Sequence, residues 1–507
     1  MAADGGRLRT AQAAQACAIC KTRKKKCSKS LPSCEYCTRK ELDCVYALDL
    51  SPQNHAAPTP DNSHTAPNWG TRPPVNAISS QLTPETTSQV YLEVHGIIRA
   101  TGQFVDDISA RYFQGFHRHL PIVSRTRFYN NITLGAAPAA DVSVLLLVIC
   151  LITYAPALGY QSRHEAARPV KQHSLYLTAR SLFAQVQVSC TPSVPLIQAA
   201  ILLAVYEYTH GRPDDALTTI TGSARMAYAA RIHTGDRLQT QMTRIAGHNA
   251  DIDFLLQAEE AANTWWGIVV YERIFLSEAT VFDQPMVTVF PGGDARLPIE
   301  PQVLDQLDLL DLESLPNIPV SCLTSPKVGG FSRTTQATCL LDLVLKSFNT
   351  PAIDSRLLQL DRLNTNIQAL LSLVMPQCQD QSGGFCTALH IAIRALFQLH
   401  WHILDQPSQA VIALFNPLEE WQKRSQEALD TVTKIVFDTA ESLVAASPVN
   451  TVIIDSMPPT YPYIARAALR HIHSDTRKEN VACLKSAEEV IQTSLDKYFK
   501  RWSVGDK

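Results

Sequence analysis

The chain has 507 residues, of which 46% are hydrophobic and 18% charged, and its formal net charge is −2. This composition excludes a wholly disordered protein, and the length suits about two to four domains or one large helical domain. Residues 1–46 carry ten basic and four acidic side chains, a charge of +6, so the remainder carries −8. This asymmetry indicates that the N-terminal region, and not the rest, meets a polyanion.

Residues 1–16 are small and polar, and we predict a disordered arm there. They lack the apolar segment of a secretory signal. The longest apolar run, Val142–Ile152, is too short to span a bilayer. We therefore expect a soluble intracellular protein with no membrane partner.

Six cysteines follow in two matching halves, each a Cys-x2-Cys pair and then a lone cysteine after six residues. Thiolates at this spacing are ligands for a soft tetrahedral ion such as zinc. The segment is too short to bury a sufficient apolar core, so metal binding has to supply its folding free energy. The predicted metal ligands are Cys17, Cys20, Cys27, Cys34, Cys37 and Cys44.

The number of ligands limits the possible sites. One tetrahedral zinc uses four cysteines and leaves two, whereas two zincs need eight ligand positions, which six cysteines fill only if two of them bridge. The duplicated halves favour one metal per half with shared thiolates. A disulfide framework, a single-zinc ribbon and a RING-type site are the alternatives. The missing secretory signal counts against a disulfide framework, and the repeat counts against a single-zinc ribbon. The absence of histidine from residues 17–44 counts against a RING-type site.

The segments Ala16–Cys27, Leu31–Cys37 and Cys44–Tyr46 resemble the fungal zinc binuclear cluster DNA-binding module. The resemblance implies a module over residues 17–46 that binds two Zn²⁺. It further implies that Cys17 and Cys34 bridge both ions, and that Pro32 turns the loop between the halves.

A basic run, Lys21–Lys26, lies between the first cysteine pair and Cys27. In the family this position holds a short helix whose C-terminal end faces the major groove of double-stranded DNA. The resemblance implies that Arg23 and Lys24 meet a CGG-like base triplet. It also implies that Lys21, Lys25, Lys26 and Lys29 mainly contact phosphates. A nuclear localisation signal or a solvated basic face is the alternative interpretation, and both functions can coexist.

Residues 47–88 are rich in Pro, Ser, Thr and Asn, and we predict a disordered linker. Its prolines forbid a continuous helix. The leucine heptad that dimerises many relatives is therefore not expected, and any homodimer would form without an evident coiled coil.

Residues 89–503 are predicted to form a large all-helical regulatory domain, with no sustained strand alternation. Leu196–Tyr208 is apolar on nearly every face, which predicts a helix buried all round. Apolar stripes over Leu363–Val374 and Trp421–Val444 predict two further helices, ended by Pro376 and Pro448. Ala482–Trp502 is predicted to be a closing amphipathic helix.

Several segments of this domain resemble the middle homology region of fungal zinc-cluster regulators. They are Arg111–Ile122, Tyr206–Arg212 with Gly222–Ala227, and Trp265–Arg273, in which Glu272 replaces the usual Asp. The resemblance covers about residues 105–300 and implies a fungal-specific transcription factor domain.

Two further patterns have competing interpretations. Val303–Leu315 alternates acidic and aliphatic residues, which suits either a coactivator-binding segment or an ordinary surface element, and we favour the second. One helix face, beginning one turn after Cys386, carries His390, Arg394, Phe397 and Trp401. We predict that it is a packed core face, and not a Cys–His catalytic pair or an effector pocket. The sequence has no phosphate-binding loop, dinucleotide fingerprint or nucleophile elbow, so we do not expect an enzyme.

The sequence thus predicts a nuclear, sequence-specific transcription factor for genes read by RNA polymerase II, with a coactivator or corepressor as a further partner. Regulators of this build with short bodies often govern secondary-metabolite gene clusters, which suggests such a cluster as the target. The alternative is a protein- or metabolite-binding regulator or repressor whose zinc module is a weak accessory.

Overall fold

The computed structural model describes two stretches of the chain. The first is 16–44, apart from 18–19, 22, 31–32, 41 and 43. The second is 84–502, apart from 134–136, 155–169, 234–251, 281–283, 307–314, 327, 381–383, 407–417, 446–456 and 475–480. The chain divides into two compact units, Met1–Ile78 and Ser79–Lys507.

The first unit is a small cysteine-centred module. Its core consists of four fully buried cysteines, against which Tyr36 and Leu42 pack. One short helix, α2 (Glu35–Arg39), begins after Cys34, whose side chain accepts from the backbone N–H of Cys37. With so little apolar surface buried, the module depends on something other than hydrophobic burial for its stability.

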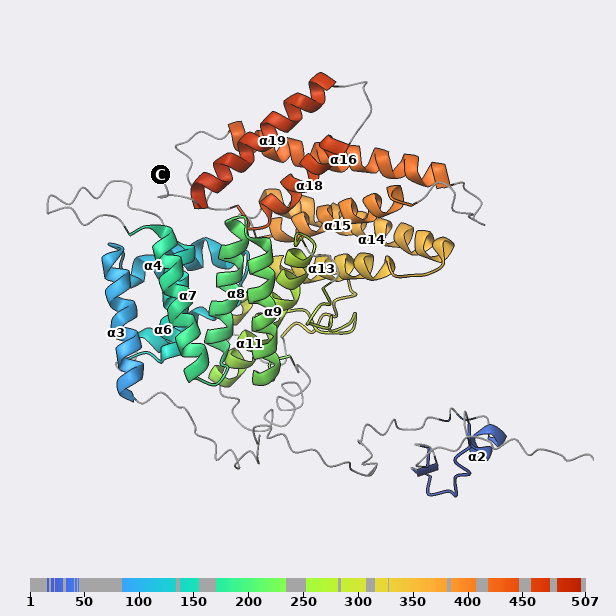
Figure 1. Ribbon diagram of the computed structural model, residues 1–507, viewed down its shortest axis with the longest axis horizontal. Coiled ribbons are helices and arrows are strands. Elements are labelled where there is room, and N and C mark those ends of the chain that lie inside the picture. The colour runs from blue at the N-terminus through green and yellow to red at the C-terminus, as the bar shows by residue number, and fades with distance from the viewer. Residues whose placement is uncertain are drawn as a thin grey trace, which may run out of the picture. The chain divides into compact units, whose positions relative to one another are not determined.

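The second unit is all-helical, as predicted, and its described residues contain no β-strand, only an isolated bridge between Arg296 and Pro319. Its first group of elements, shown in blue and green in Figure 1, comprises α3 (Pro84–Ala100), α4 (Val105–Gln114), η1 (Phe116–Arg118), α5 (Arg125–Thr133), α6 (Ala140–Ile152), α7 (Gln172–Ser189), α8 (Val194–Thr209), α9 (Pro213–Ala230) and α11 (Ile252–Leu276).

The long helices of the second group that are drawn in yellow and orange run across the direction of α8 and α9 in Figure 1. The second group comprises α12 (Pro301–Leu304), α13 (Gly330–Ser347), α14 (Ile353–Asp380), α15 (Cys386–Leu404), α16 (Leu418–Ala445), α18 (Tyr461–Ser474) and α19 (Val481–Trp502).

No helix in the described parts of the chain combines the length and apolarity that a membrane span requires.

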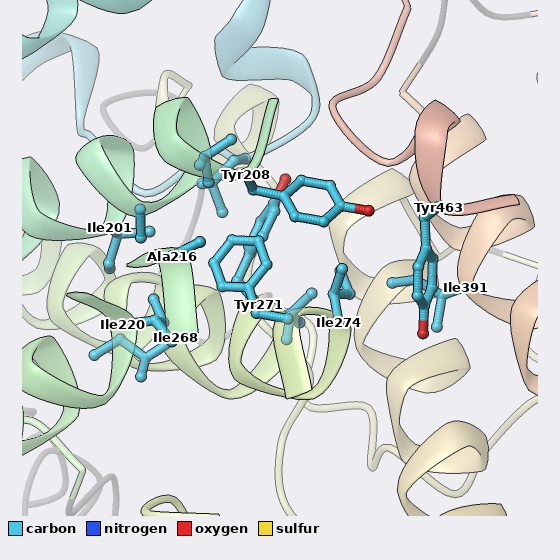
Figure 2. Packing of buried hydrophobic residues seen from close by; sticks show 14 of the residues in the cluster. Ile201, Tyr208, Ala216, Ile220, Ile268, Tyr271, Ile274, Ile391 and Tyr463 are labelled. Atoms are coloured by element: carbon cyan, nitrogen blue, oxygen red, sulfur yellow. The ribbon is translucent and has the colours of Figure 1, made fainter. Parts of the chain in front are cut away.

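Helix α8 lies at the centre of the first group, where it packs against α6, α9 and α11. The prediction of a helix buried all round is confirmed, because every residue from Leu196 to Thr209 is buried. Ser193 caps its N-terminus by accepting from the backbone N–H of Leu196, and Pro195 occupies the first turn, where a missing N–H costs nothing. Figure 2 shows Ile201 and Tyr208 of this helix packed with Ile268 and Tyr271 of α11.

Buried charges join the two helix groups. Arg273 on α11 donates from Nε to Asp342 of α13 at 3.0 Å, and both side chains are almost fully buried. Glu272 accepts from the backbone N–H of Thr288 at 3.0 Å. Nearby, Arg394 of α15 pairs with Glu278 at 2.8 Å. Removing one partner of such a pair would leave an uncompensated buried charge, so these contacts hold α11 in register with α13 and α15.

Two predicted boundaries differ from the structure. Helix α14 does not end at Pro376 but continues to Asp380. Proline frees the carbonyl of residue i−4, here Ser372, and both residues lie on the exposed side of α14, where water can satisfy that carbonyl. Helix α3 begins at Pro84, inside the segment predicted as linker, with proline in the first turn.

Other predicted features lie wholly or partly outside the described residues. The rest of the linker, Pro32, Pro448 and most of Val303–Leu315 are among them. Helices α16 and α19 match the predicted stripes.

Candidate metal centre and nucleic-acid interface

The six cysteines of the N-terminal module come together as two overlapping groups of four. Within each group, all thiol sulfurs lie within 4.8 Å of one another. Cys17 and Cys34 belong to both groups, whereas the other four cysteines belong to one each. One group is completed by Cys20 and Cys27, and the other by Cys37 and Cys44.

The sulfur–sulfur distances fit metal coordination. The Sγ atoms of Cys17 and Cys34 are 3.8 Å apart, those of Cys17 and Cys37 3.7 Å, and those of Cys20 and Cys34 3.7 Å. A disulfide needs about 2.05 Å, which these pairs far exceed. Four thiolates about 2.3 Å from a tetrahedral zinc lie about 3.8 Å from each other. The residues present therefore fit zinc.

The two halves of the module repeat the same local structure with an offset of 17 residues. The backbone N–H of Cys20 donates to Cys17 Sγ, and that of Cys37 donates to Cys34 Sγ, both at 3.4 Å. The two Cys-x2-Cys pairs thus share the same local hydrogen bond. The sequence repeat is in this way a structural repeat, with one group of four thiols on each half.

Without a cation, the thiols of Cys20 and Cys37 resist ionisation. Burial, followed by hydrogen bonds to neighbouring thiols, raises the pKa of Cys20 to about 12, and the same causes raise the pKa of Cys37. Burial also opposes ionisation of Cys44, but the backbone N–H of Cys34 and other hydrogen bonds outweigh it and lower the pKa to about 7. A divalent ion among these sulfurs would supply the positive charge that stabilises thiolates at such close range.

The basic run begins as a single short helical turn. Cys20 and Lys21 are helical, and the turn ends at Lys24, whose φ of 50° is left-handed. The backbone N–H of Lys25 donates to the carbonyl of Cys20 at 2.9 Å, and that of Lys24 to the carbonyl of Lys21 at 3.3 Å. This is the Schellman pattern, which terminates a helix. Cys27 must turn back towards the other sulfurs, so the helix stops after a single turn.

The structure leaves the predicted DNA contacts accessible. Five of them, Lys21, Arg23, Lys24, Lys25 and Lys26, are exposed. The sixth, Lys29, is half-buried and is also left-handed, with φ 58°. A dense positive charge is thus presented on one loop beside the thiols.

Two further exposed basic residues, Arg39 and Lys40, lie at the end of α2 in the second half. Neither residue is among the predicted DNA contacts. The 17-residue offset makes Lys40 the counterpart of Arg23 in the repeat.

The helical unit does not assemble the catalytic pair considered at Cys386 and His390. His390 is buried, and its Nδ1 lies 2.9 Å from Thr460 Oγ1. Burial and then the neighbouring His119 lower the pKa of His390 to about 3. The thiol of Cys386 instead hydrogen-bonds with Cys378. Arg394, Phe397 and Trp401 are buried with His390, so the predicted core face is confirmed.

Comparisons with known proteins match both parts of the chain. Residues 15–53 match the fungal Zn(2)-Cys(6) binuclear cluster domain, and residues 110–277 match the fungal specific transcription factor domain. The chain is also similar to the transcription factor BOA15 of Botryotinia fuckeliana (strain B05.10). Identity is 30% over 135 residues, which cover 27% of this chain and 71% of that protein. No solved structure matches the chain.

Proposed function

Because the chain belongs to the fungal Zn(2)-Cys(6) transcription factors, we propose that its N-terminal module binds two zinc ions and reads a short DNA sequence. The family is one of transcription factors, not enzymes. We further propose which cysteines hold each ion and which residues contact DNA.

The observation that carries the metal proposal is the pair of thiol groups that share Cys17 and Cys34. Each group offers four sulfurs to one tetrahedral ion, so six cysteines fill eight ligand positions. In the proposed site Cys17 and Cys34 bridge, while Cys20 and Cys27 complete one ion and Cys37 and Cys44 the other. Zinc has no redox chemistry here, and its part is to hold the two halves of the module together.

The proposed DNA contacts divide between bases and phosphates. Lys24 is the last residue of the helical turn, and a lysine at this place can donate to guanine N7 and O6 in the major groove. We propose that Arg23 and Lys24 read a CGG-like triplet in double-stranded DNA. Lys21, Lys25, Lys26 and Lys29 contact phosphates and hold the module in register.

Lys24 and Lys29 form a matched pair for testing this division. Both are lysines in the left-handed conformation, so Lys24→Ala and Lys29→Ala remove the same charge from the same kind of backbone. With the full chain, Lys24→Ala should weaken binding to CGG-containing DNA by roughly 1–3 kcal/mol relative to scrambled DNA. Lys29→Ala should weaken binding to both DNAs equally and reduce the salt slope by about 1.

The test is a titration of both DNAs at several salt concentrations, with zinc content measured on each variant. Equal losses on the two DNAs for Lys24→Ala would reduce Lys24 to a phosphate contact. A selective loss for Lys29→Ala would reverse the proposed assignment.

We further propose a cellular role for the protein. We place the protein in the nucleus, acting on genes read by RNA polymerase II through a coactivator or corepressor, with a secondary-metabolite gene cluster as its target. A homodimer, if one forms, would do so without an evident coiled coil. Comparing transcripts from strains with and without the gene tests the target: coordinated change across one linked gene cluster supports it, and scattered change contradicts it.

A further inference from the structure

Two cysteine thiols of the helical unit lie in contact, outside the metal module. Cys378 lies in the last turn of α14, and Cys386 is the first residue of α15. The two thiols form a hydrogen bond with each other. Both cysteines are free and half-buried, so neither is sealed from solvent. The proposed zinc binding and DNA recognition make no use of this pair.

The pair joins the ends of two helices that follow each other in the chain. Only residues 379–385 separate the two cysteines, so a covalent bond between them would close a short loop. A third helix contacts this loop, because a Cβ at Gly330, the first residue of α13, would collide with the backbone of Gly384. A bond across the loop would therefore act where α13, α14 and α15 meet.

The two thiols differ in how readily they ionise. The hydrogen bond from Cys378 lowers the pKa of Cys386, and this effect outweighs the opposing effect of burial. The same hydrogen bond, followed by burial, raises the pKa of Cys378. The position of Cys386 supports this order independently, because the unpaired backbone N–H groups at the start of a 19-residue helix favour negative charge. Cys386 is thus the thiol that ionises first, and Cys378 is the one that stays protonated.

The surroundings of the pair favour redox chemistry over metal binding. Among the described residues, no third metal-ligating side chain lies close enough to complete a zinc site with these two thiols. Two thiols in contact, one of which ionises readily, can instead be oxidised to a disulfide. In cytosolic and nuclear proteins such a disulfide is usually transient and serves catalysis or redox sensing.

We propose that Cys386 and Cys378 form a reversible disulfide when the protein reacts with a hydroperoxide. The Cys386 thiolate attacks the hydroxyl oxygen of the peroxide: an S–O bond forms, the O–O bond breaks, and the other oxygen takes up a proton and leaves as an alcohol or as water. The Cys378 sulfur then attacks the sulfur of the resulting sulfenic acid. The S–S bond forms, the S–O bond breaks, and water leaves with the Cys378 proton. Two thiols are oxidised and one peroxide is reduced.

A dithiol reductant reverses the reaction by thiol–disulfide exchange, in which the reductant itself becomes the disulfide. The site makes the junction of α13, α14 and α15 responsive to oxidation, which is a function separate from DNA recognition. It does not rest on the proposed zinc or DNA contacts, and its failure would leave them unchanged.

Mass mapping of the full-length, zinc-loaded protein tests the proposal directly. Trypsin cleaves after Lys and Arg, so Cys378 and Cys386 fall in one peptide, residues 363–394, which contains no other cysteine. The protein is treated with hydrogen peroxide, and the remaining thiols are blocked with N-ethylmaleimide before digestion. We expect this peptide to lose two hydrogens and to take up no maleimide, and we expect dithiothreitol to restore both thiols.

Cys190 is the internal comparison, because it is also half-buried and burial raises its pKa. The disulfide should form at least tenfold faster than Cys190 loses its free thiol. A peroxide dose that oxidises Cys190 while peptide 363–394 keeps both thiols would overturn the proposal. Oxidation of Cys386 to a sulfinic acid without any disulfide would overturn it as well.

Two substitutions test the separate roles of the thiols. Cys378→Ser should stop the reaction at the sulfenic acid of Cys386, which dimedone traps, whereas Cys386→Ser should leave Cys378 as slow to react as Cys190. Cys190→Ser is the control and should leave disulfide formation unchanged. Circular dichroism shows whether each variant folds, and the mapping of the unsubstituted protein decides the proposal where one does not. A dimedone adduct on Cys378 in Cys386→Ser, with none on Cys386 in Cys378→Ser, would contradict the assigned roles.

Discussion

Among single residues, Cys17 and Cys34 differ from the other cysteines because each belongs to both thiol groups. Replacing Cys17 should therefore remove a ligand from both proposed ions, whereas replacing Cys27 should affect one. We expect Cys17→Ala to retain less than one zinc per chain, and Cys27→Ala to retain more zinc than Cys17→Ala. Metal analysis of the purified variants checks this, and equal zinc contents would argue against shared thiolates.

His390 connects burial at one residue to the pH dependence of the helical unit. Its folded-state pKa of about 3 lies below the ordinary 6.5, so the unfolded state binds the proton more readily. The stability that neutral His390 contributes is complete above pH 6.5 and is lost as the pH falls towards 3. Each pH unit in this window costs up to about 1.4 kcal/mol per buried histidine.

His390→Gln should accordingly make the fall in unfolding free energy between pH 6.5 and pH 5 shallower by up to about 2 kcal/mol. His173→Gln is the control, because that ring is exposed on α7. Denaturant unfolding at a series of pH values measures both. An unchanged slope for His390→Gln would show that His390 takes up its proton without unfolding.

Among the helices, the contact between α11 and the chain before α5 depends on a glycine. A Cβ on Gly267 would lie 2.9 Å from Ile122 Cγ2 and 3.3 Å from Leu120 Cδ1, and both neighbours are buried. Gly222 in α9 has nothing within 4 Å of the same position. The two glycines therefore separate helix propensity from packing.

Gly222→Ala should stabilise the helical unit by about 0.5–1 kcal/mol through helix propensity alone. Gly267→Ala gains the same propensity, but overpacking costs typically 1–3 kcal/mol, so we expect net destabilisation. Chemical denaturation of the two variants measures the difference. Stabilisation by Gly267→Ala would mean that Ile122 moves aside at little cost.

At this scale the sequence predicts helix positions better than helix ends. The run Leu196–Tyr208 predicts α8 closely because burial on every face leaves few other structures for so apolar a segment. The end of α14 is missed because the effect of Pro376 depends on whether the carbonyl it frees can meet water, which a linear pattern does not contain. The point at which the short turn after Cys20 ends is not in the sequence for a related reason, since the chain must return Cys27 to the sulfurs.

For the candidate sites, too, features that are local in sequence can be predicted and features that depend on three-dimensional packing cannot. Cysteine spacing alone indicates the metal ligands, because ligand chemistry and repeat are both local in sequence. A pocket of the helical unit lined by Phe128, Val142 and Ala258 cannot be predicted from the sequence, since its lining comes from helices separated by many residues.

At the scale of the whole molecule, the two units differ in charge and in the source of their stability. The module Met1–Ile78 contains most of the basic excess, and the unit Ser79–Lys507 contains a continuous apolar core of its own. Metal binding is the source of stability for the first unit, and hydrophobic burial is the source for the second. This division explains how a chain with a net charge of −2 can contain a region suited to DNA.

The most direct measurement is selection of bound sequences from random DNA by the full-length protein, with zinc content determined on the same sample. The account predicts two zincs per chain and enrichment of a CGG-like triplet, with one triplet indicating a monomer and two a dimer. One zinc per chain, or no enrichment above the salt-sensitive background, would contradict it. The function would then have to be sought in the helical unit.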